Sequence, residues 1–317
     1  MTGWGDHMPS AAHAEMVEQI IANGQRTPEE PPTPRLLTAI RENELVSVPP
    51  TPDDMQVEET TMGGVPCIVV SPRAGESLGT IVFVHGGGYI WMTARTHLLV
   101  AAALARATGC RCVSVEYRRA PEHPYPAPVE DLVAVYRALL DQGVPARRIT
   151  FAGDSAGGGL VVGGLVALRD AGDTLPAAAV SISPWTDLAV TGASADTADD
   201  PIVSGAALRM MATLYLDGAD PRSPTASPLY ADLRDLPPLL VQVGTREAPG
   251  VVEHAGPERE EELVRLLDAR AQRMHLALAS PKSLMLRHPR LRSLRADRPS
   301  VRDPRDGWPP GAIPGTA

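Results

Sequence analysis

The chain has 317 residues, 44% of them hydrophobic, and a formal net charge of −9 at pH 7. This length and apolar content allow a large buried core in one big α/β domain. The acidic balance argues against a surface that neutralises nucleic-acid phosphates, so we expect no nucleic-acid partner.

The first twenty residues contain neither the basic nor the apolar segment of a signal peptide. No later stretch has eighteen unbroken apolar residues, so we expect no membrane partner and place the protein in the cytoplasm. Cys67, Cys110 and Cys112 lie in or beside strand-like runs without the spacing of a metal site. We therefore predict buried, reduced thiols at these positions.

Residues 1–50 precede any strand pattern and indicate two helical pieces, at about 9–24 and 34–43, that could cover a site. They are separated by the proline-rich segment RTPEEPPTP, which a helix cannot cross. Residues 51–247 then alternate β-branched runs with alanine- and leucine-rich runs, which predicts an α/β fold with a mostly parallel sheet.

The expected strands lie at 56–62, 66–72, 80–86, 110–117, 148–154, 177–183 and 238–244, and the expected helices at about 94–107, 127–142, 157–170 and 204–216. The proline-marked insert 184–230 is a second candidate cover, because ligand sites in such sheets lie at the carboxyl ends of strands.

GDSAG, residues 153–157, joins an expected strand to an expected helix. Glycines on both sides of a serine allow the sharp strand-to-helix turn that exposes a nucleophilic hydroxyl, so Ser155 is the candidate nucleophile. The alternative is a glycine-rich turn that is needed only for packing.

A second glycine-rich segment, His85-Gly86-Gly87-Gly88, follows the strand at 80–86. Residues without side chains let backbone N–H groups approach a ligand oxygen, so we predict Gly86 and Gly87 as donors to an oxyanion, together with Ala156. A phosphate-binding loop is excluded, since that motif requires a lysine and the chain has only Lys282.

The sequence contains three segments in the order and spacing found in the hormone-sensitive-lipase-like family, the bacterial family IV esterases: HGGGY, EYRRAPEHPYPAPVED and GDSAGGG. They are followed by SPWTDL and LYLDGADPRSPTASPLY. The chain resembles that family over roughly residues 10–247. The resemblance implies an α/β-hydrolase fold, an N-terminal helical cap and a small-molecule ester substrate with a short acyl chain. It implies no metal or organic cofactor, and it implies a homodimer formed through the final strand. It makes Asp154, Glu122, His85 and His123 structural supports.

The acid of an α/β hydrolase follows the strand at 238–244, and the histidine comes later in the chain. By resemblance, Glu247 is the candidate acid. His254, His275 and His288 remain as candidate bases, and His275, 28 positions after Glu247, is the nearest fit.

Residues 248–317 depart from the family. No Val, Ile, Thr, Phe, Tyr or Trp occurs between 265 and 300, so we expect a helix at 258–279 and then a disordered tail rich in arginine and proline, rather than a strand. Seventeen arginines lie in 1–247 and eleven in 248–317. We interpret the break as a single-nucleotide frame change near codon 248, with an independently evolved tail as the alternative.

Two functions therefore remain open. The first is a carboxylesterase that works through a serine nucleophile and an acyl-enzyme. The second is a catalytically impaired hydrolase-fold protein, without its triad histidine, that binds small acyl ligands.

Overall fold

The computed structural model describes residues 27–243, apart from residues 47, 49, 76, 193, 194, 196–199 and 201. All of these residues belong to one compact unit of the chain. The helix predicted at 9–24 and everything predicted for 248–317 lie outside the described residues, and the predicted domain limits stay predictions.

The described strands form one sheet in the order β1-β2-β4-β3-β5-β6-β7. Their bounds are β1 Met55–Met62, β2 Val65–Pro72, β3 Thr80–Val84, β4 Arg111–Val115, β5 Ile149–Asp154, β6 Ala178–Ile182 and β7 Leu239–Gln242. The β1–β2 and β2–β4 pairs are antiparallel, and the other pairs are parallel. The predicted mostly parallel sheet is confirmed, and each expected strand is present within a few residues of its predicted bounds.

The described α-helices are α2 Pro34–Val46, α3 Leu98–Thr108, α4 Ala127–Asp141, α5 Ala156–Asp170 and α7 Gly205–Leu216, and two short 3₁₀ helices lie at Ala146–Arg148 and Pro228–Tyr230. The five α-helices match the five segments predicted within the described ranges. Within those ranges every helix is too short or too polar to span a bilayer.

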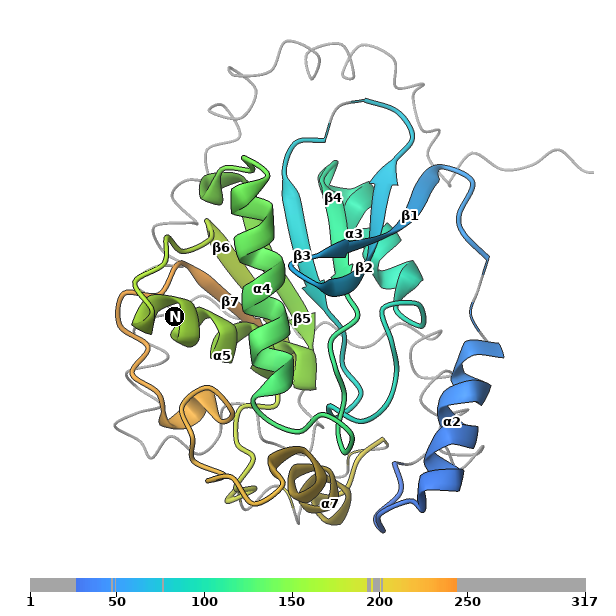
Figure 1. Cartoon of the computed structure of the whole chain (residues 1–317), viewed down its shortest axis with the longest axis vertical. Helices are drawn as coiled ribbons and strands as arrows, with labels where there is room; N and C mark the ends of the chain where they lie inside the picture. The colour runs from blue at the N-terminus through green and yellow to red at the C-terminus, as the bar shows by residue number, and fades with distance from the viewer. Residues whose placement is uncertain are drawn as a thin grey trace, which may run out of the picture. The chain divides into compact units, whose positions relative to one another are not determined.

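Helices cover both faces of the sheet, with α4 and α5 in front of it and α3 behind it in Figure 1. Two separate clusters of buried side chains reflect this layering: Val82 and Val84 of β3 face the α4–α5 side, and Ile81 and Phe83 face α3. Because both faces are covered, every residue of β3 is buried, in agreement with a sequence that is apolar at each position after Thr80. All three cysteines are free thiols. Cys67 and Cys112 are buried, as predicted, whereas Cys110 is only half-buried.

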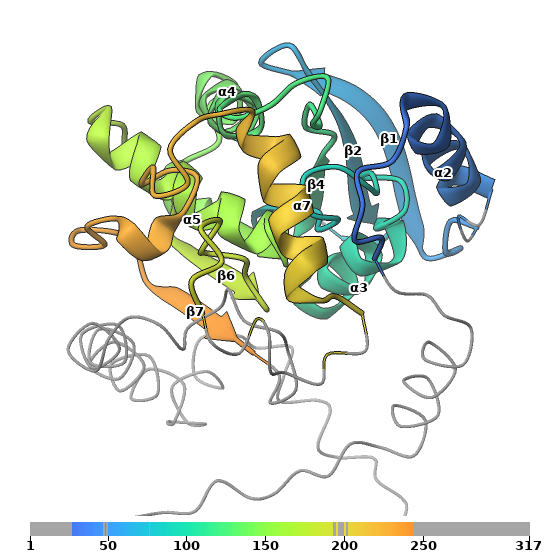
Figure 2. The same cartoon turned by 90° about the horizontal axis from the view of Figure 1, so that it is seen from below.

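The segment that follows β3 lies against α2 and α7, which stand below the sheet in Figure 1. Figure 2 views the molecule from that end and shows α7 lying over the sheet, with α2 to one side beyond β2 and β1. The Tyr89 ring stacks on Tyr215 of α7 with 3.8 Å between ring centroids. Both helices therefore cover the end of the sheet where the glycine-rich motifs predict the site.

Candidate active site

Ser155 occupies the turn between β5 and α5, with φ 52° and ψ −121°. A non-glycine residue at positive φ is strained, and such strain persists only where the surroundings hold it. Here the Ser155 N–H donates to the Ile182 carbonyl at 2.8 Å, and its carbonyl accepts the N–H groups of Gly159 at 3.0 Å and Trp185 at 2.9 Å. The side chain is exposed. This is the geometry of a nucleophile elbow.

Gly157, the second residue of α5, lets the end of β3 approach the elbow. A Cβ on Gly157 would stand 2.5 Å from the His85 carbonyl oxygen, and it would overlap the Val84 carbonyl as well. Since β3 and β5 are paired with Val84 beside Gly153, the segment 85–88 leaves the sheet next to Ser155. The two glycine-rich motifs, about seventy residues apart in sequence, therefore meet.

The backbone N–H groups of Gly87, Gly88 and Ala156 find no hydrogen-bond acceptor among the described residues. Ala156 is the first residue of α5, where helical N–H groups have no partner inside the helix and the helix dipole favours negative charge. Gly87 has φ +108°, and a Cβ there would overlap the Trp91 backbone, so only glycine fits. These N–H groups are available to a ligand oxygen.

The N–H group of Gly86, which was also predicted as an oxyanion donor, already has an acceptor. This N–H donates to Asp154 Oδ1 at 3.1 Å, so the carboxylate competes with any oxyanion for this proton. A Cβ on Gly86 would also collide with that carboxylate. Asp154 thus fastens the glycine-rich segment to the elbow, which agrees with the structural role that the family resemblance implies for it.

His97, which no sequence pattern singled out, lies on the other side of Asp154. Its Nε2 atom is 3.6 Å from Asp154 Oδ2. Its Nδ1 atom is within 3.2 Å of Thr96 Oγ1 and 3.3 Å of the Thr93 carbonyl. His97 immediately precedes α3, so the start of α3, the elbow and the glycine-rich segment meet at one carboxylate.

His85 is fully buried and stacks on Tyr117, with ring centroids 4.3 Å apart. Its Nδ1 atom lies 2.7 Å from the Gly86 carbonyl, and the Tyr117 hydroxyl donates to the His85 carbonyl at 3.0 Å. Burial, with a smaller contribution from nearby His97, lowers the pKa of His85 to about 3. A buried, neutral imidazole supports the segment and does not exchange protons with a substrate, as the family resemblance implies.

This burial predicts a pH dependence of stability. The unfolded chain binds the His85 proton near pH 6.5 and the folded chain only near pH 3, so stability present above pH 6.5 is lost as pH falls toward 3. We expect His85→Asn, which retains a side-chain donor but does not titrate, to lose less free energy of unfolding between pH 6.5 and 4. The difference between the two proteins should be on the order of 1 kcal/mol per pH unit. Urea unfolding at pH 7, 6, 5 and 4 measures it, and equal slopes would contradict the assignment.

The predicted acid Glu247 and the predicted base His275 lie outside the described residues, as do His254 and His288. Their roles stay predictions. Among the residues that the structure describes, no group of three His, Cys, Asp or Glu side chains could hold a metal ion.

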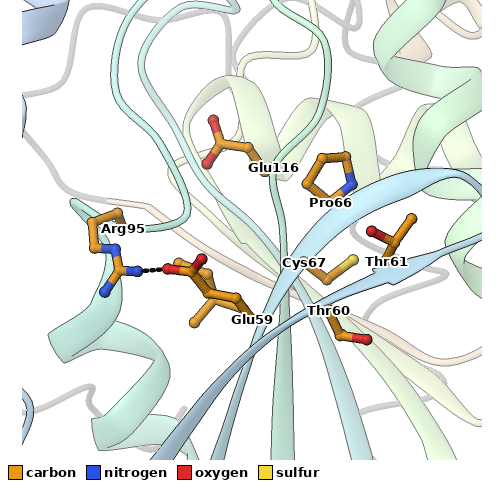
Figure 3. Close-up of a pocket in the computed structure, with 8 residues that line it drawn as sticks. Glu59, Thr60, Thr61, Pro66, Cys67, Arg95 and Glu116 are labelled. Atoms are coloured by element: carbon orange, nitrogen blue, oxygen red, sulfur yellow. Dashed lines mark ion pairs between the residues drawn. The ribbon is translucent and has the colours of Figure 1, made fainter.

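A cavity of about 410 Å³ opens at the antiparallel edge of the sheet, two strands away from β3 (Figure 3). Glu59 and Arg95 form an ion pair beside it, and Glu116 reaches it from the end of β4. Ser155 and the glycines 86–88 are not part of its wall. This cavity is therefore distinct from the elbow.

The sheet order and the Ser155 turn define an α/β hydrolase. A family model described as alpha/beta hydrolase fold matches residues 81–249, which include both glycine-rich motifs.

Proteins that are similar to this chain assign it to a smaller group within the α/β hydrolases. An acetyl-hydrolase of Streptomyces hygroscopicus is 45% identical over 238 residues, which cover 74% of this chain and 77% of that protein. Carboxylesterase NlhH of Mycobacterium tuberculosis is 33% identical over 224 residues, 65% of this chain and 69% of that protein. The crystal structure of an esterase from the bacterial hormone-sensitive lipase family superimposes with a TM-score of 0.71 at 41% identity, covering 84% of this chain and 85% of that one. EstE5-PMSF gives a TM-score of 0.70 at 36% identity, with 83% and 85% covered.

The chain belongs to the hormone-sensitive-lipase-like family of bacterial esterases, as its motifs indicate, and is a carboxylester hydrolase.

Proposed function

We propose that the protein hydrolyses short-chain acyl esters through a covalent acyl-enzyme on Ser155. The observation that carries this proposal is the strained, exposed Ser155 at the start of α5, with N–H groups beside it that have no acceptor among the described residues. The preference for short acyl chains is supported by the Streptomyces hygroscopicus relative, which is named an acetyl-hydrolase.

The reaction takes two steps. Ser155 Oγ attacks the ester carbonyl carbon while its proton passes to a histidine, and the resulting oxyanion accepts hydrogen bonds from Ala156 and Gly87. Gly88 is a further donor in this proposal, since the Gly86 N–H is held by Asp154. Collapse of the tetrahedral intermediate expels the alcohol, which takes the proton from the histidine, and water then cleaves the acyl-enzyme by the same route.

His275 is the proposed base and Glu247 the residue that orients it. The alternative, an impaired hydrolase that binds acyl ligands without a base, is supported by the departure of residues 248–317 from the family pattern. The predicted homodimer and cytoplasmic location stay predictions.

Hydrolysis of p-nitrophenyl acetate, butyrate and octanoate by purified protein separates the two functions. If the protein is an esterase, we expect His275→Ala to lower kcat by about 10³-fold or more and Glu247→Gln to lower it by less. We also expect the acetate and butyrate esters to be hydrolysed faster than the octanoate ester. His254→Ala and His288→Ala serve as matched controls and should retain activity. If the wild-type protein hydrolysed these esters only at the background rate, and His275→Ala left that rate unchanged, the impaired binding protein would be favoured.

A further inference from the structure

Residues 87–92, which include the oxyanion glycines Gly87 and Gly88, form a turn whose backbone is strained at Tyr89 and Met92. Gly87 and Gly88 have φ of 108° and 60°, and the non-glycine residues Tyr89 and Met92 have φ of 64° and 61°. The N–H groups of Ile90 and Trp91 both donate to the Gly87 carbonyl, at 3.0 and 2.8 Å, and close the segment into a turn. The direction of the Gly87 and Gly88 N–H groups depends on this turn, which must be held from outside because its own backbone disfavours it.

Arg41 of α2 holds the centre of the turn. Its Nε and Nη2 atoms both donate to the Ile90 carbonyl, at 3.1 and 2.9 Å. Nη2 also donates to the Ala120 carbonyl at 2.7 Å, and Nη1 donates to Glu122 Oε1 at 2.9 Å. The Arg41 side chain is only 18% exposed, so its charge-assisted bonds to the Ile90 and Ala120 carbonyls form largely out of water, where such bonds are strongest.

Two more charged side chains hold the end of the turn at Met92. Glu44, three residues after Arg41 on α2, accepts the Met92 N–H at 2.9 Å. Arg119 donates to the Met92 carbonyl at 2.6 Å. Burial raises the pKa of Glu44 above its usual range, although the bond from Met92 opposes the shift. Both polar groups of this strained residue are therefore bound by side chains from distant parts of the chain.

The helix that supplies Arg41 and Glu44 is itself fixed to the core. Leu37 is buried, and Ile40 packs against the same cluster that contains Ile90 and Trp91. Leu37, Ile40, Arg41 and Glu44 follow the spacing of one helical face. This face of α2 docks on the turn through apolar contacts and through its two charged residues.

We propose that Arg41 is a positioning residue for ester hydrolysis, through which the N-terminal helix α2 sets the direction of the oxyanion N–H groups. Arg41 does not touch the reacting atoms and acts through the Ile90 carbonyl. Lysine cannot replace it, because an ammonium group lacks the planar fork that serves Ile90, Ala120 and Glu122 together. This inference rests on the proposed function of Ser155 and of the Gly87 and Gly88 N–H groups.

Steady-state kinetics of Arg41→Ala and Arg41→Lys with p-nitrophenyl butyrate test the proposal, with Arg35→Ala, an exposed arginine on the same helix, as the matched control. We expect kcat to fall about 10- to 100-fold in both Arg41 variants with less than about a 3-fold change in KM, because misplaced donors weaken the transition state and not the bound ester. Arg35→Ala should keep the wild-type kcat. Millimolar ethylguanidinium should restore part of the activity of Arg41→Ala and none in Arg41→Lys, whose side chain fills the site.

Hydrogen–deuterium exchange gives a second readout that does not need catalysis. Peptides covering residues 86–92 should exchange at least about 10-fold faster in the Arg41 variants than in wild type and Arg35→Ala. The proposal would be overturned if the Arg41 variants kept the wild-type kcat per folded molecule and the wild-type exchange rate. It would also be overturned if a lower melting temperature were the only change in these variants. If the wild-type enzyme were inactive, the proposed function would fail, while exchange would still decide whether Arg41 holds the turn. If Arg41→Ala did not fold, Arg41→Lys would decide.

Discussion

Ser155→Ala should lose hydrolysis of p-nitrophenyl esters by at least about 10⁴-fold in kcat/KM, because the variant retains the oxyanion donors but has no nucleophile. Alanine and serine are equally strained at φ 52°, so the variant should fold with nearly the wild-type free energy of unfolding. The measurement is initial-rate kinetics, with circular dichroism as the check on folding.

Two companion experiments sharpen this result. Phenylmethanesulfonyl fluoride should add one sulfonyl group to the wild-type protein by intact mass spectrometry and none to Ser155→Ala. Ser155→Gly should be equally inactive but about 1 kcal/mol more stable than Ser155→Ala, because glycine accepts positive φ without strain. Retained activity in Ser155→Ala would show that another group attacks the ester.

The Gly157→Ala substitution should cost at least about 3 kcal/mol of unfolding free energy and remove most of the activity. The added methyl would overlap the carbonyl oxygens of Val84 and His85, which are backbone atoms and cannot rotate away. Relief requires the end of β3 to move from the elbow, and this movement carries Gly87 away from Ser155. Urea unfolding measures the first effect, and p-nitrophenyl butyrate hydrolysis measures the second.

Gly164→Ala is the matched control, because it lies in the same helix, α5. Its Cβ would meet only the Leu132 side chain, with Cδ2 at 2.7 Å, and a side chain can shift. Alanine also favours the helix over glycine by up to about 1 kcal/mol, which offsets part of that contact. A similar loss of stability in the two variants would contradict the close approach of β3 to the elbow at Gly157.

Much of the fold could be predicted because each element has a local cause. The strand at Thr80–Val84 is apolar at every position after Thr80 because both of its faces are covered. Gly63 and Gly64 between β1 and β2 both have positive φ, which closes a tight hairpin with Met62 opposite Val65. Ser155 could be found for the same reason, since its turn needs the glycines that flank it in the sequence.

The partners of the site residues could not be predicted in this way. Nothing adjacent to Gly86 indicates that its N–H is bound to Asp154, 68 residues away, and no pattern marks His97 as the neighbour of that carboxylate. Arg41 carries no local signature either, because its acceptors lie 49, 79 and 81 residues further along the chain.

The difference between the elements that the sequence predicts and the side-chain partners that it does not predict has a physical reason. Backbone conformation and the alternation of buried and exposed positions depend on residues within a turn or strand, so the sequence by itself determined the sheet, its helices, the strained serine and the glycine-rich segment beside it. Hydrogen bonds between side chains and distant backbone depend on how those elements pack. Only the tertiary structure therefore decided that Asp154 occupies the Gly86 N–H, and that α2 reaches the strained turn through Arg41 and Glu44.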